Sequence, residues 1–332
     1  MPNPTSSDLH VNAPLTDVSV AYMQDQSAFI AAKVFPNVPV KMKSDLYYKY
    51  NQEDFMTSQM QERAPGAESA GSGWRVSTDS YFCRDFALHD DIPDQNRANA
   101  DPVFDNLDTD SVNFLTQNAM IKRELDFASN YFTAGVWSYN TTGQAGASNM
   151  AGNLSQYWNI AASTPIEDMR YAVKAIHKGS GIKPNFAIFG ASAWYALLDN
   201  ADFLDRVKYS GSPNTNPARN SQEIVATILG LKNIYVMEAV YNTAAENAGF
   251  TGAFVGDKAA LIGYAAPAAG KRVVSAGYTF SWTGWTGAGI EGNRIKKFRL
   301  ERNASDRIEI EMAYALKVVA PSLGFYFGTC VQ

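Results

Sequence analysis

The chain has 332 residues, a formal net charge of −5, and 46% hydrophobic against 18% charged residues. This length and balance describe an ordered globular protein of one large or two ordinary domains, and they exclude an intrinsically disordered chain. The basic residues form no long run, which argues against a dedicated nucleic-acid-binding surface.

Residues 1–40 are expected to form an arm. Residues 1–14 are polar and interrupted by prolines, which predicts an extended chain. From Thr16 onwards, apolar residues recur at helical spacing, at Val18, Tyr22, Phe29 and Ala32, and predict a helix. We expect this helix to end at VFPNVPV (34–40), because the two prolines there favour extended backbone.

Residues 41–92 are expected to form a long hairpin. Its predicted strands are DLYYKYNQEDF (45–55) and WRVSTDSYFCRDFALHDDI (74–92). The second strand alternates apolar residues on one parity, at Val76, Phe82, Phe86 and Leu88. A two-stranded ribbon is only marginally stable alone in water, so this tyrosine-rich hairpin predicts a partner that covers it.

The tip of the predicted hairpin is the glycine-rich stretch PGAESAGSG (65–73). Gly66 and Gly71 have the spacing of a phosphate-binding loop, but no lysine follows them. Glu68 also places a negative charge where an anion would bind. We therefore interpret the stretch as a mobile tip, whose glycines allow several backbone conformations, and not as a nucleotide site.

The strongest helical pattern in the sequence spans about residues 102–134. Asp101 is a suitable N-cap and Pro102 suits the first helical position. The apolar residues at helical spacing are Leu107, Phe114, Ile121, Leu125, Ala128 and Phe132. A helix of this length is well above the mean of about 11–12 residues, so we expect a structural spine.

Residues 157–265 combine helical and strand patterns. Thr164, Pro165 and Glu167 predict a capping box at the start of a helix that ends at Gly179. The other predicted elements are helices from Ser192 to Leu204 and from Asn220 to Gly230, strands at 185–190 and 233–240, and two strands within 253–265. This alternation predicts a sheet flanked by helices, and the chain then ends in β structure with a last strand at 307–319.

Two sets of residues are candidates for a catalytic or metal site, and neither favours one. The HDD stretch (89–91) is the only histidine–carboxylate cluster, and it lacks further ligands at helical spacing. Asp101, Asp105 and Asp108 share a helix face, where carboxylates near a helix N-terminus are ordinary complements of the dipole. No nucleophile elbow, zinc-type cysteine pair or HExxH motif occurs. We therefore predict no catalytic, cofactor or metal site, and no enzyme.

Cellular context is indicated by a few further features. The two cysteines, Cys83 and Cys330, are far apart and are expected to be free thiols in a reducing cytosol. No apolar stretch approaches the ~18 residues that a membrane span needs. The first twenty residues lack the basic start and apolar run of a signal peptide, so we expect synthesis in the cytoplasm.

The order of these segments resembles that of the major capsid proteins of tailed bacteriophages, which have the Hong Kong 97-type fold. The stretches that carry the resemblance are FIAAKVFPNVPVK (29–41), the hairpin strand and tip, residues 164–209, and MAYALKVVAPSLGFYFG (312–328). The resemblance implies an α+β fold with an arm (1–40), an extended hairpin loop (41–92), a peripheral domain (93–156 and 266–332) containing the spine helix, and an α/β axial domain (157–265).

The resemblance also implies a function. Such a chain self-assembles, as pentamers and hexamers, into the icosahedral head shell that encloses the double-stranded DNA of a tailed phage, and it resides in the virion after synthesis in the host cytoplasm. No long charged segment precedes the arm, so a separate scaffolding protein is implied, together with a portal and a decoration protein. Contact with packaged DNA would be independent of its sequence, and no membrane is involved.

Eight residues are candidates for contacts between subunits: Val18, Tyr22 and Phe29 on the arm, and Tyr48, Tyr50, Arg63, Glu68 and Trp74 on the hairpin loop. Three other readings stay open at this point. An encapsulin-type compartment shares the fold but encloses cargo enzymes, a cytosolic α/β enzyme would use residues 157–265, and a tube or decoration protein would be another part of a virion.

Overall fold

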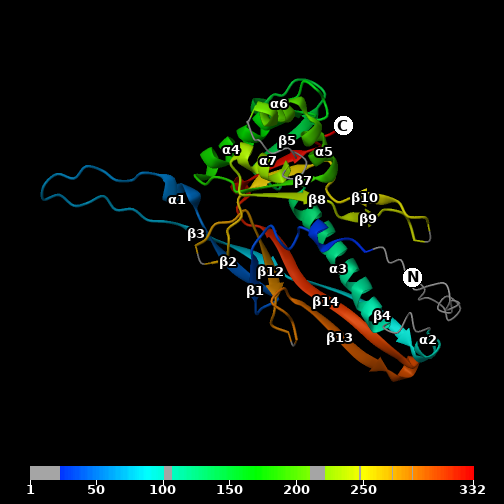
Figure 1. The fold of residues 1–332 in the computed structure, drawn as a ribbon. Coiled ribbons are helices and arrows are strands. Elements are labelled where there is room, and N and C mark those ends of the chain that lie inside the picture. Colours follow the sequence, from blue (N-terminus) through cyan, green and yellow to red (C-terminus); the bar gives the residue numbers. More distant parts are fainter. Residues whose placement is uncertain (1–22, 101–106, 210–220, 247, 271, 286) are drawn as a thin grey trace.

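The structure is a computed structural model that describes residues 23–100, 107–209, 221–246, 248–270, 272–285 and 287–332. A six-stranded sheet lies beyond one end of the long helix α3 (Leu107–Tyr131), a five-stranded sheet runs alongside the helix, and a thin hairpin projects to one side (Figure 1). The combination of helices with sheets that contain both parallel and antiparallel pairs is an α+β fold, as predicted.

A six-stranded sheet forms the core of the first lobe, which we call the α/β lobe. Its strands, in spatial order, are β6 (Leu154–Gln156), β5 (Tyr139–Gln144), β15 (Gly324–Gly328), β11 (Ala260–Gly263), β7 (Phe186–Gly190) and β8 (Asn233–Met237). Every residue of β7 and β11 is buried, which explains why both read as short apolar runs rather than as alternating strands.

Helices cover this sheet: α4 (Pro165–Ser180), α5 (Ala191–Asp199), α6 (Ala201–Tyr209) and α7 (Ser221–Leu229). Helix α4 buries Ile166, Met169 and Ile176 against the sheet and ends at Gly181, whose φ of 71° is the left-handed conformation that glycine adopts readily. The predicted capping box is wrong, because the Thr164 side chain makes no capping hydrogen bond. A short hairpin of β9 (Val240–Asn242) and β10 (Gly252–Phe254) follows β8.

A five-stranded sheet forms the second lobe, which we call the β lobe. Its strands are β1 (Asn37–Val40), β12 (Gly277–Trp282), β14 (Ser305–Val318), β13 (Asn293–Leu300) and β4 (Arg84–Pro93). The long strand β14 pairs with β13, β12 and β4. Helix α3 packs on one face of it, with Leu115 against Ile308 and Ile310. The predicted spine helix is thus present over Leu107–Tyr131, while residues 101–106 lie outside the described chain.

The hairpin consists of β2 (Ser44–Tyr50) and β3 (Val76–Phe82), joined through the short helix α1 (Gln52–Met56) and an extended loop. Two expectations are corrected here. The first predicted strand stops at Tyr50, because residues 52–56 form a helix that carries Glu53 and Asp54 in its first turn. The second splits at Cys83, since β3 pairs with β2 whereas β4 pairs with β14.

The apolar parity of this region faces solvent in the isolated chain. Val76, Phe82 and Leu88 are exposed, while the opposite parity buries Tyr81 and Cys83 against β12. Tyr81 stacks on Phe280 with ring centroids 4.5 Å apart. The alternation of apolar residues therefore identified the strands. It did not show which face of the strands is buried within the subunit.

The start of the described chain differs from the predicted helix. Residues 26–28 form only a short 3-10 helix, and residues 29–35 pack between α3 and the six-stranded sheet. The Phe35 ring lies 4.7 Å from that of Tyr131 and 5.6 Å from that of Phe186, measured between centroids. The end of the arm is therefore part of the core.

The sheets divide the chain differently from the expected domain boundaries. Strands β5 and β6, expected in the peripheral domain, lie in the six-stranded sheet, and β15 lies at its centre between β5 and β11. The last strand of the β lobe is β14, and Pro321–Leu323 lead from it into β15. Among the described helices, none has the length and apolar character needed to cross a membrane.

Candidate assembly surfaces

The hairpin loop is fixed at its root and extended beyond it (Figure 1). The Asp54 carboxylate accepts hydrogen bonds from the Arg75 backbone N–H at 2.7 Å and from Arg75 Nη2 at 2.9 Å. These bonds lower the pKa of Asp54. The Gln52 side chain donates to the Gly179 carbonyl, which seats α1 on the end of α4. From this root, residues 57–75 continue without helix or strand.

The hairpin exposes an unusual amount of apolar surface for a soluble chain. Tyr48 is 73% exposed and Met60 is 95% exposed. Tyr50 lies against Phe55 and Trp74, with centroid distances of 6.0 and 5.4 Å, yet Trp74 remains 58% exposed. The other large apolar side chains exposed on the hairpin are Leu46, Phe55, Met56, Val76 and Phe82. Apolar surface on this scale marks a site that a partner covers.

The eight predicted contact residues fall into three groups: five on the hairpin, two outside the described residues, and Phe29, which is buried. Tyr48, Tyr50, Arg63, Glu68 and Trp74 are all on the hairpin and all exposed. Val18 and Tyr22 lie outside the described residues.

Phe29 departs from the expectation that it is available to a neighbour. Its side chain is only 7% exposed and belongs to the chain's own core. Its place there follows from residues 29–35 filling the space between α3 and the six-stranded sheet, and little of its surface remains for another subunit.

A buried carboxylate, which sequence reasoning missed, holds this segment to the spine helix. Glu124 of α3 has an exposed fraction of 0%, and its Oε2 accepts the backbone N–H groups of Ile30 at 3.2 Å and Ala31 at 2.9 Å. Its other oxygen, Oε1, has no hydrogen-bond partner among the described residues. Burial raises the pKa of Glu124 to about 7, although the two hydrogen bonds act in the opposite direction.

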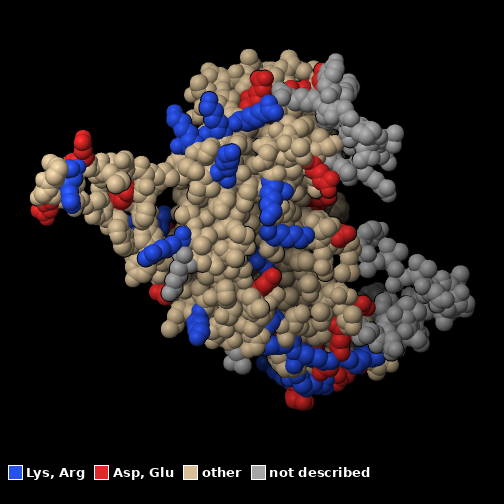
Figure 2. Space-filling view, turned by 60° about the vertical axis from the view of Figure 1, so that its left-hand side comes forward, with Lys and Arg blue, Asp and Glu red and all other residues tan. Residues whose placement is uncertain are grey.

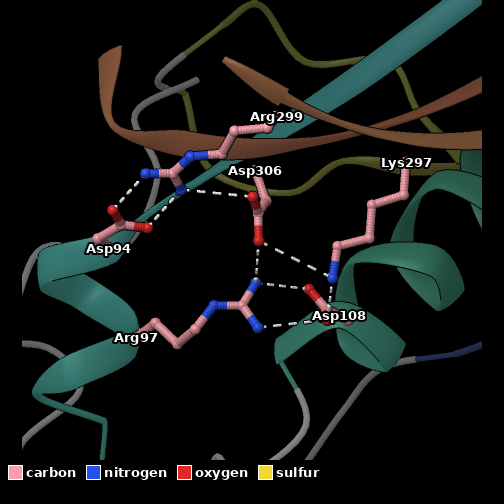
Figure 3. Close-up of polar contacts among 6 residues, drawn as sticks. All are labelled: Asp94, Arg97, Asp108, Lys297, Arg299 and Asp306. Carbon is pink, nitrogen blue, oxygen red and sulfur yellow. Dashed lines mark hydrogen bonds and ion pairs between the residues drawn. The ribbon is translucent and has the colours of Figure 1, made fainter. Parts of the chain in front are cut away.

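An ion-pair network, also not predicted, ties together the far end of the β lobe (Figure 3). It joins α2 (Asp94–Ala98), α3, β13 and β14 through Asp94, Arg97, Asp108, Lys297, Arg299 and Asp306. Arg97 Nη2 lies 2.8 Å from Asp108 and 3.2 Å from Asp306. Asp108, considered above as a complement of the helix dipole, therefore also links α3 to α2 and β13.

The HDD carboxylates hold structural elements together. Arg307 Nε and Nη2 donate to the two oxygens of Asp91 at 2.6 and 2.7 Å, directly across the β4–β14 pair, and this pairing lowers the pKa of Asp91. Asp90 accepts a hydrogen bond from Ser111 of α3. Within the described part of the chain, no three His, Cys, Asp or Glu side chains gather as a metal site would require.

A cavity of about 300 Å³ lies between residues 32–37 and the edge of the α/β lobe. Its polar lining includes Lys33, Asn185, Lys232 and Tyr235, and no carboxylate, histidine or cysteine lines it. Of the side chains that commonly act as general bases or nucleophiles, this lining contains only lysine and tyrosine. Both cysteines are free and buried, as thiols, elsewhere in the fold.

Comparison with known proteins gives matches at the level of sequence and of structure. A family model described as phage major capsid protein E matches residues 143–276. The major capsid protein of Burkholderia phage BcepMu is 24% identical over 234 residues, which cover 70% of each chain. A crystal structure of a phage-related protein from Bordetella bronchiseptica RB50 superposes with a TM-score of 0.65 at 18% identity and covers 92% of this chain and 93% of its own. The capsid protein of cyanophage P-SCSP1u superposes with a TM-score of 0.59 at 13% identity and covers 100% and 96%.

An encapsulin from Synechococcus elongatus shares the fold at a TM-score of 0.50 and 10% identity. The fold therefore does not separate phage shells from encapsulins, whereas the family model and the sequence relative are both phage proteins. Fold, family match and sequence relative agree, and we conclude that this chain is a major capsid protein of a phage with the Hong Kong 97-type fold.

Proposed function

We propose that the chain assembles, as rings of five and six copies, into the icosahedral head shell that encloses the double-stranded DNA of a tailed phage. The observation that carries this proposal is the hairpin, because it presents a row of exposed apolar side chains far from the chain's own core. Its loop, residues 57–75, has the length and reach to lie over a neighbouring copy. A closed symmetric assembly covers such a surface on every subunit.

The two lobes have separate roles in this proposal. The α/β lobe is the axial domain that meets its copies around each ring, and the β lobe with α3 is the peripheral domain. The ion-pair network of Figure 3 stiffens the far end of the β lobe, where neighbouring rings meet. A separate scaffolding protein guides closure, a portal occupies one vertex, and a decoration protein binds the outer surface. Synthesis takes place in the host cytoplasm.

The first experiment removes the hairpin loop. Strand pairing ends at Tyr50 and Val76, so a two-residue Asn-Gly turn in place of residues 51–75 keeps the ribbon paired. We expect a subunit that still unfolds in one cooperative thermal transition but forms no closed particles by negative-stain electron microscopy. Normal particles from this variant would contradict the role of the loop.

A second experiment separates the apolar surface from the presence of the loop. Met60→Ser with Trp74→Ser removes apolar area, whereas Met60→Leu with Trp74→Phe keeps most of it. We expect the serine pair to lower the yield of particles at least tenfold and the conservative pair to assemble like the wild type. Quantification of nucleic acid inside native particles then distinguishes a DNA-filled head from an encapsulin-type compartment.

A further inference from the structure

Helix α4 carries a row of positive charge on its solvent-facing side. Arg170, Lys174 and Lys178 follow one another at intervals of four residues, and all three are exposed. Successive residues of this row lie about 6 Å apart along the helix axis. Like charges at this spacing destabilise a helix, so a bound anion would stabilise it. The helix dipole favours the cation at Lys178, in the last turn, but does not account for the two that precede that turn.

Two further lysines extend this row beyond the end of α4. Lys183 follows the helix, Lys232 lies between α7 and β8, and both are exposed. The two segments meet, because the backbone N–H groups of Lys232 and Asn233 both donate to the Asn185 carbonyl, at 2.9 and 3.0 Å. We call Arg170, Lys174, Lys178, Lys183 and Lys232 the basic surface. Figure 2 shows Lys and Arg side chains spread over the upper body on the side from which the hairpin projects.

The cavity at the edge of the α/β lobe continues the basic surface. Lys232 lines this cavity together with Asn233, and no carboxylate is among its lining residues. Lys33 also lines it, although its ammonium group already donates to two backbone carbonyls. The cavity therefore brings no negative charge to the end of the basic surface that Lys232 forms.

Within the described chain, no carboxylate forms an ion pair with the basic surface. Arg170 Nη2 donates to the Ile228 carbonyl at 3.5 Å, and a guanidinium has four further N–H donors. On α4 itself, Glu167 lies in the first turn, where a carboxylate complements the helix dipole, and Asp168 is buried. The positive charge of the basic surface is therefore not neutralised within the subunit.

An anion from outside the subunit fits this surface best. Many carboxylates of the β lobe and of the hairpin root already have cations of their own, as Asp91 has Arg307 and Asp54 has Arg75. In the proposed shell, the densest negative charge is that of the enclosed duplex DNA, which carries one charge per about 1.7 Å of its axis. Lysine and arginine side chains that contact phosphate position DNA without reading its sequence.

We propose that the basic surface binds the phosphate backbone of the enclosed DNA, so that this side of the α/β lobe faces the interior of the shell. The inference rests on the proposed shell function. No basic run appears in the sequence, because helical spacing and the contact at Asn185, rather than succession along the chain, bring the five residues together. Cation–phosphate contacts release counterions, so this binding weakens steeply as the salt concentration rises.

The first test measures binding of the full-length, unassembled subunit to a short DNA duplex by fluorescence anisotropy, over a series of NaCl concentrations. Lys174→Gln with Lys178→Gln removes two charges and keeps good helix formers. We expect this pair to reduce the slope of log affinity against log salt by about 2, and the affinity at low salt about tenfold. Its thermal unfolding midpoint should not fall, because the substitutions relieve repulsion between like charges.

Two further pairs complete the binding test. Lys183→Gln with Lys232→Gln lies outside the helix and should give a loss of the same size. Lys41→Gln with Arg302→Gln is the matched control, since both residues are exposed and lie outside the basic surface, and it should bind the duplex like the wild type.

The second test uses closed particles. Both pairs in the basic surface should assemble with the wild-type yield, as counted by negative-stain electron microscopy, because the surface contacts DNA and not another subunit. Intact empty shells of the wild type should bind little added duplex, whereas the same shells dissociated into subunits should bind it, because the basic surface lies inside.

Each outcome bears on the inference in a defined way. A wild-type subunit without duplex affinity at low salt, unchanged binding in both pairs, or an equal loss in the control pair would overturn it. A lower particle yield with unchanged duplex binding would assign the surface to a protein partner and overturn it as well. Strong duplex binding by intact shells would contradict the interior placement. A wild-type chain that forms no particles beside its scaffold would overturn the shell function, a failure that the subunit assay detects separately because it needs no particles.

Discussion

Glu124 Oε2 accepts the backbone N–H of Ala31 at 2.9 Å, across 93 residues of sequence, inside a core that excludes solvent from the carboxylate. The same oxygen accepts the N–H of Ile30. One side chain of the spine helix therefore satisfies two backbone donors of an irregular segment that no strand pairs. Unpaired buried donors cost free energy, so this carboxylate stabilises the entry of the chain into the fold.

The first prediction concerns the pH dependence that Glu124 confers. Its pKa is about 7 in the folded chain against an ordinary 4.5, so the folded state holds the proton more tightly. Below about pH 4.5 the carboxyl is protonated in both states and does not lower the free energy of unfolding. As the pH rises from there towards and through 7, ionisation of the buried carboxyl lowers the free energy of unfolding. The gap of about 2.5 pH units corresponds to about 3 kcal/mol at most.

Glu124→Gln removes this titration and keeps an oxygen that accepts the two N–H groups. We expect the variant to gain stability relative to the wild type between pH 5 and pH 8, measured by urea unfolding at several pH values. Glu62→Gln, at an exposed position on the hairpin loop, serves as the control. The difference between its free energy of unfolding and that of the wild type should not change with pH. A pH-independent difference between Glu124→Gln and the wild type would contradict the prediction.

The second prediction concerns two N-terminal truncations. Removing residues 1–22 takes away none of the described core, and we expect the thermal unfolding midpoint of the subunit to stay within a few degrees. Removing residues 1–35 deletes Phe29, Ile30, Val34 and Phe35, which are all buried, and orphans Glu124. Since truncating one large buried side chain costs about 2–5 kcal/mol, this longer deletion should prevent stable folding, as judged by calorimetry.

A third prediction uses two glycines that differ in their surroundings. A Cβ at Gly190, where β7 meets α5, would collide with the backbone carbonyls of Gly256 and Asp257. Gly190→Ala should therefore cost about 1–3 kcal/mol or more, because backbone must move. Gly71→Ala, on the hairpin loop with nothing near its Cβ, should leave the thermal midpoint unchanged. Equal thermal unfolding midpoints for the two variants would contradict the prediction, because they would show that the backbone at the β7–α5 junction can move at little cost in free energy.

The fourth prediction concerns the ion-pair network of Figure 3. Asp306 lies within 4 Å of three cations, at 3.2 Å from Arg97, 3.4 Å from Arg299 and 3.9 Å from Lys297. The network is partly exposed, so Asp306→Asn should cost only about 1 kcal/mol of subunit stability at low salt. Because salt screens exposed charges, the cost should shrink in 1 M NaCl. A loss that is independent of salt would indicate a packing effect instead.

Much of the fold could be predicted because its signals are local. Buried strands such as β7 appear as apolar runs closed by glycine, and α3 and α4 follow a helical period with suitable N-terminal residues. The hairpin was recognised, and so was the exposure of Tyr48 and Trp74, since polar and glycine-rich sequence surrounds them. These features depend on neighbours within a few residues.

The parts that could not be predicted depend on distant partners. Whether Phe29 or Phe82 is buried depends on which sheet and helix lie nearby, and periodicity carries no such information. Glu124 sits in α3 beside other charged residues such as Arg123 and Asp126, so its sequence does not mark it as buried, and its contact with Ala31 arises only after folding. The pairing of β4 with β14 likewise separates it from β3, although both belong to one continuous stretch of alternating sequence.

Strand β15 lies between β5 and β11, in the interior of the six-stranded sheet, although it follows every other described strand in the sequence. The ribosome must therefore synthesise residue 328 before that sheet can close. Until then the nascent chain lacks a finished α/β lobe, and its interlocking surfaces are not yet in place. Synthesis of β15 is thus a precondition for a finished α/β lobe, and a chain that lacks it would leave β5 and β11 without the strand that joins them.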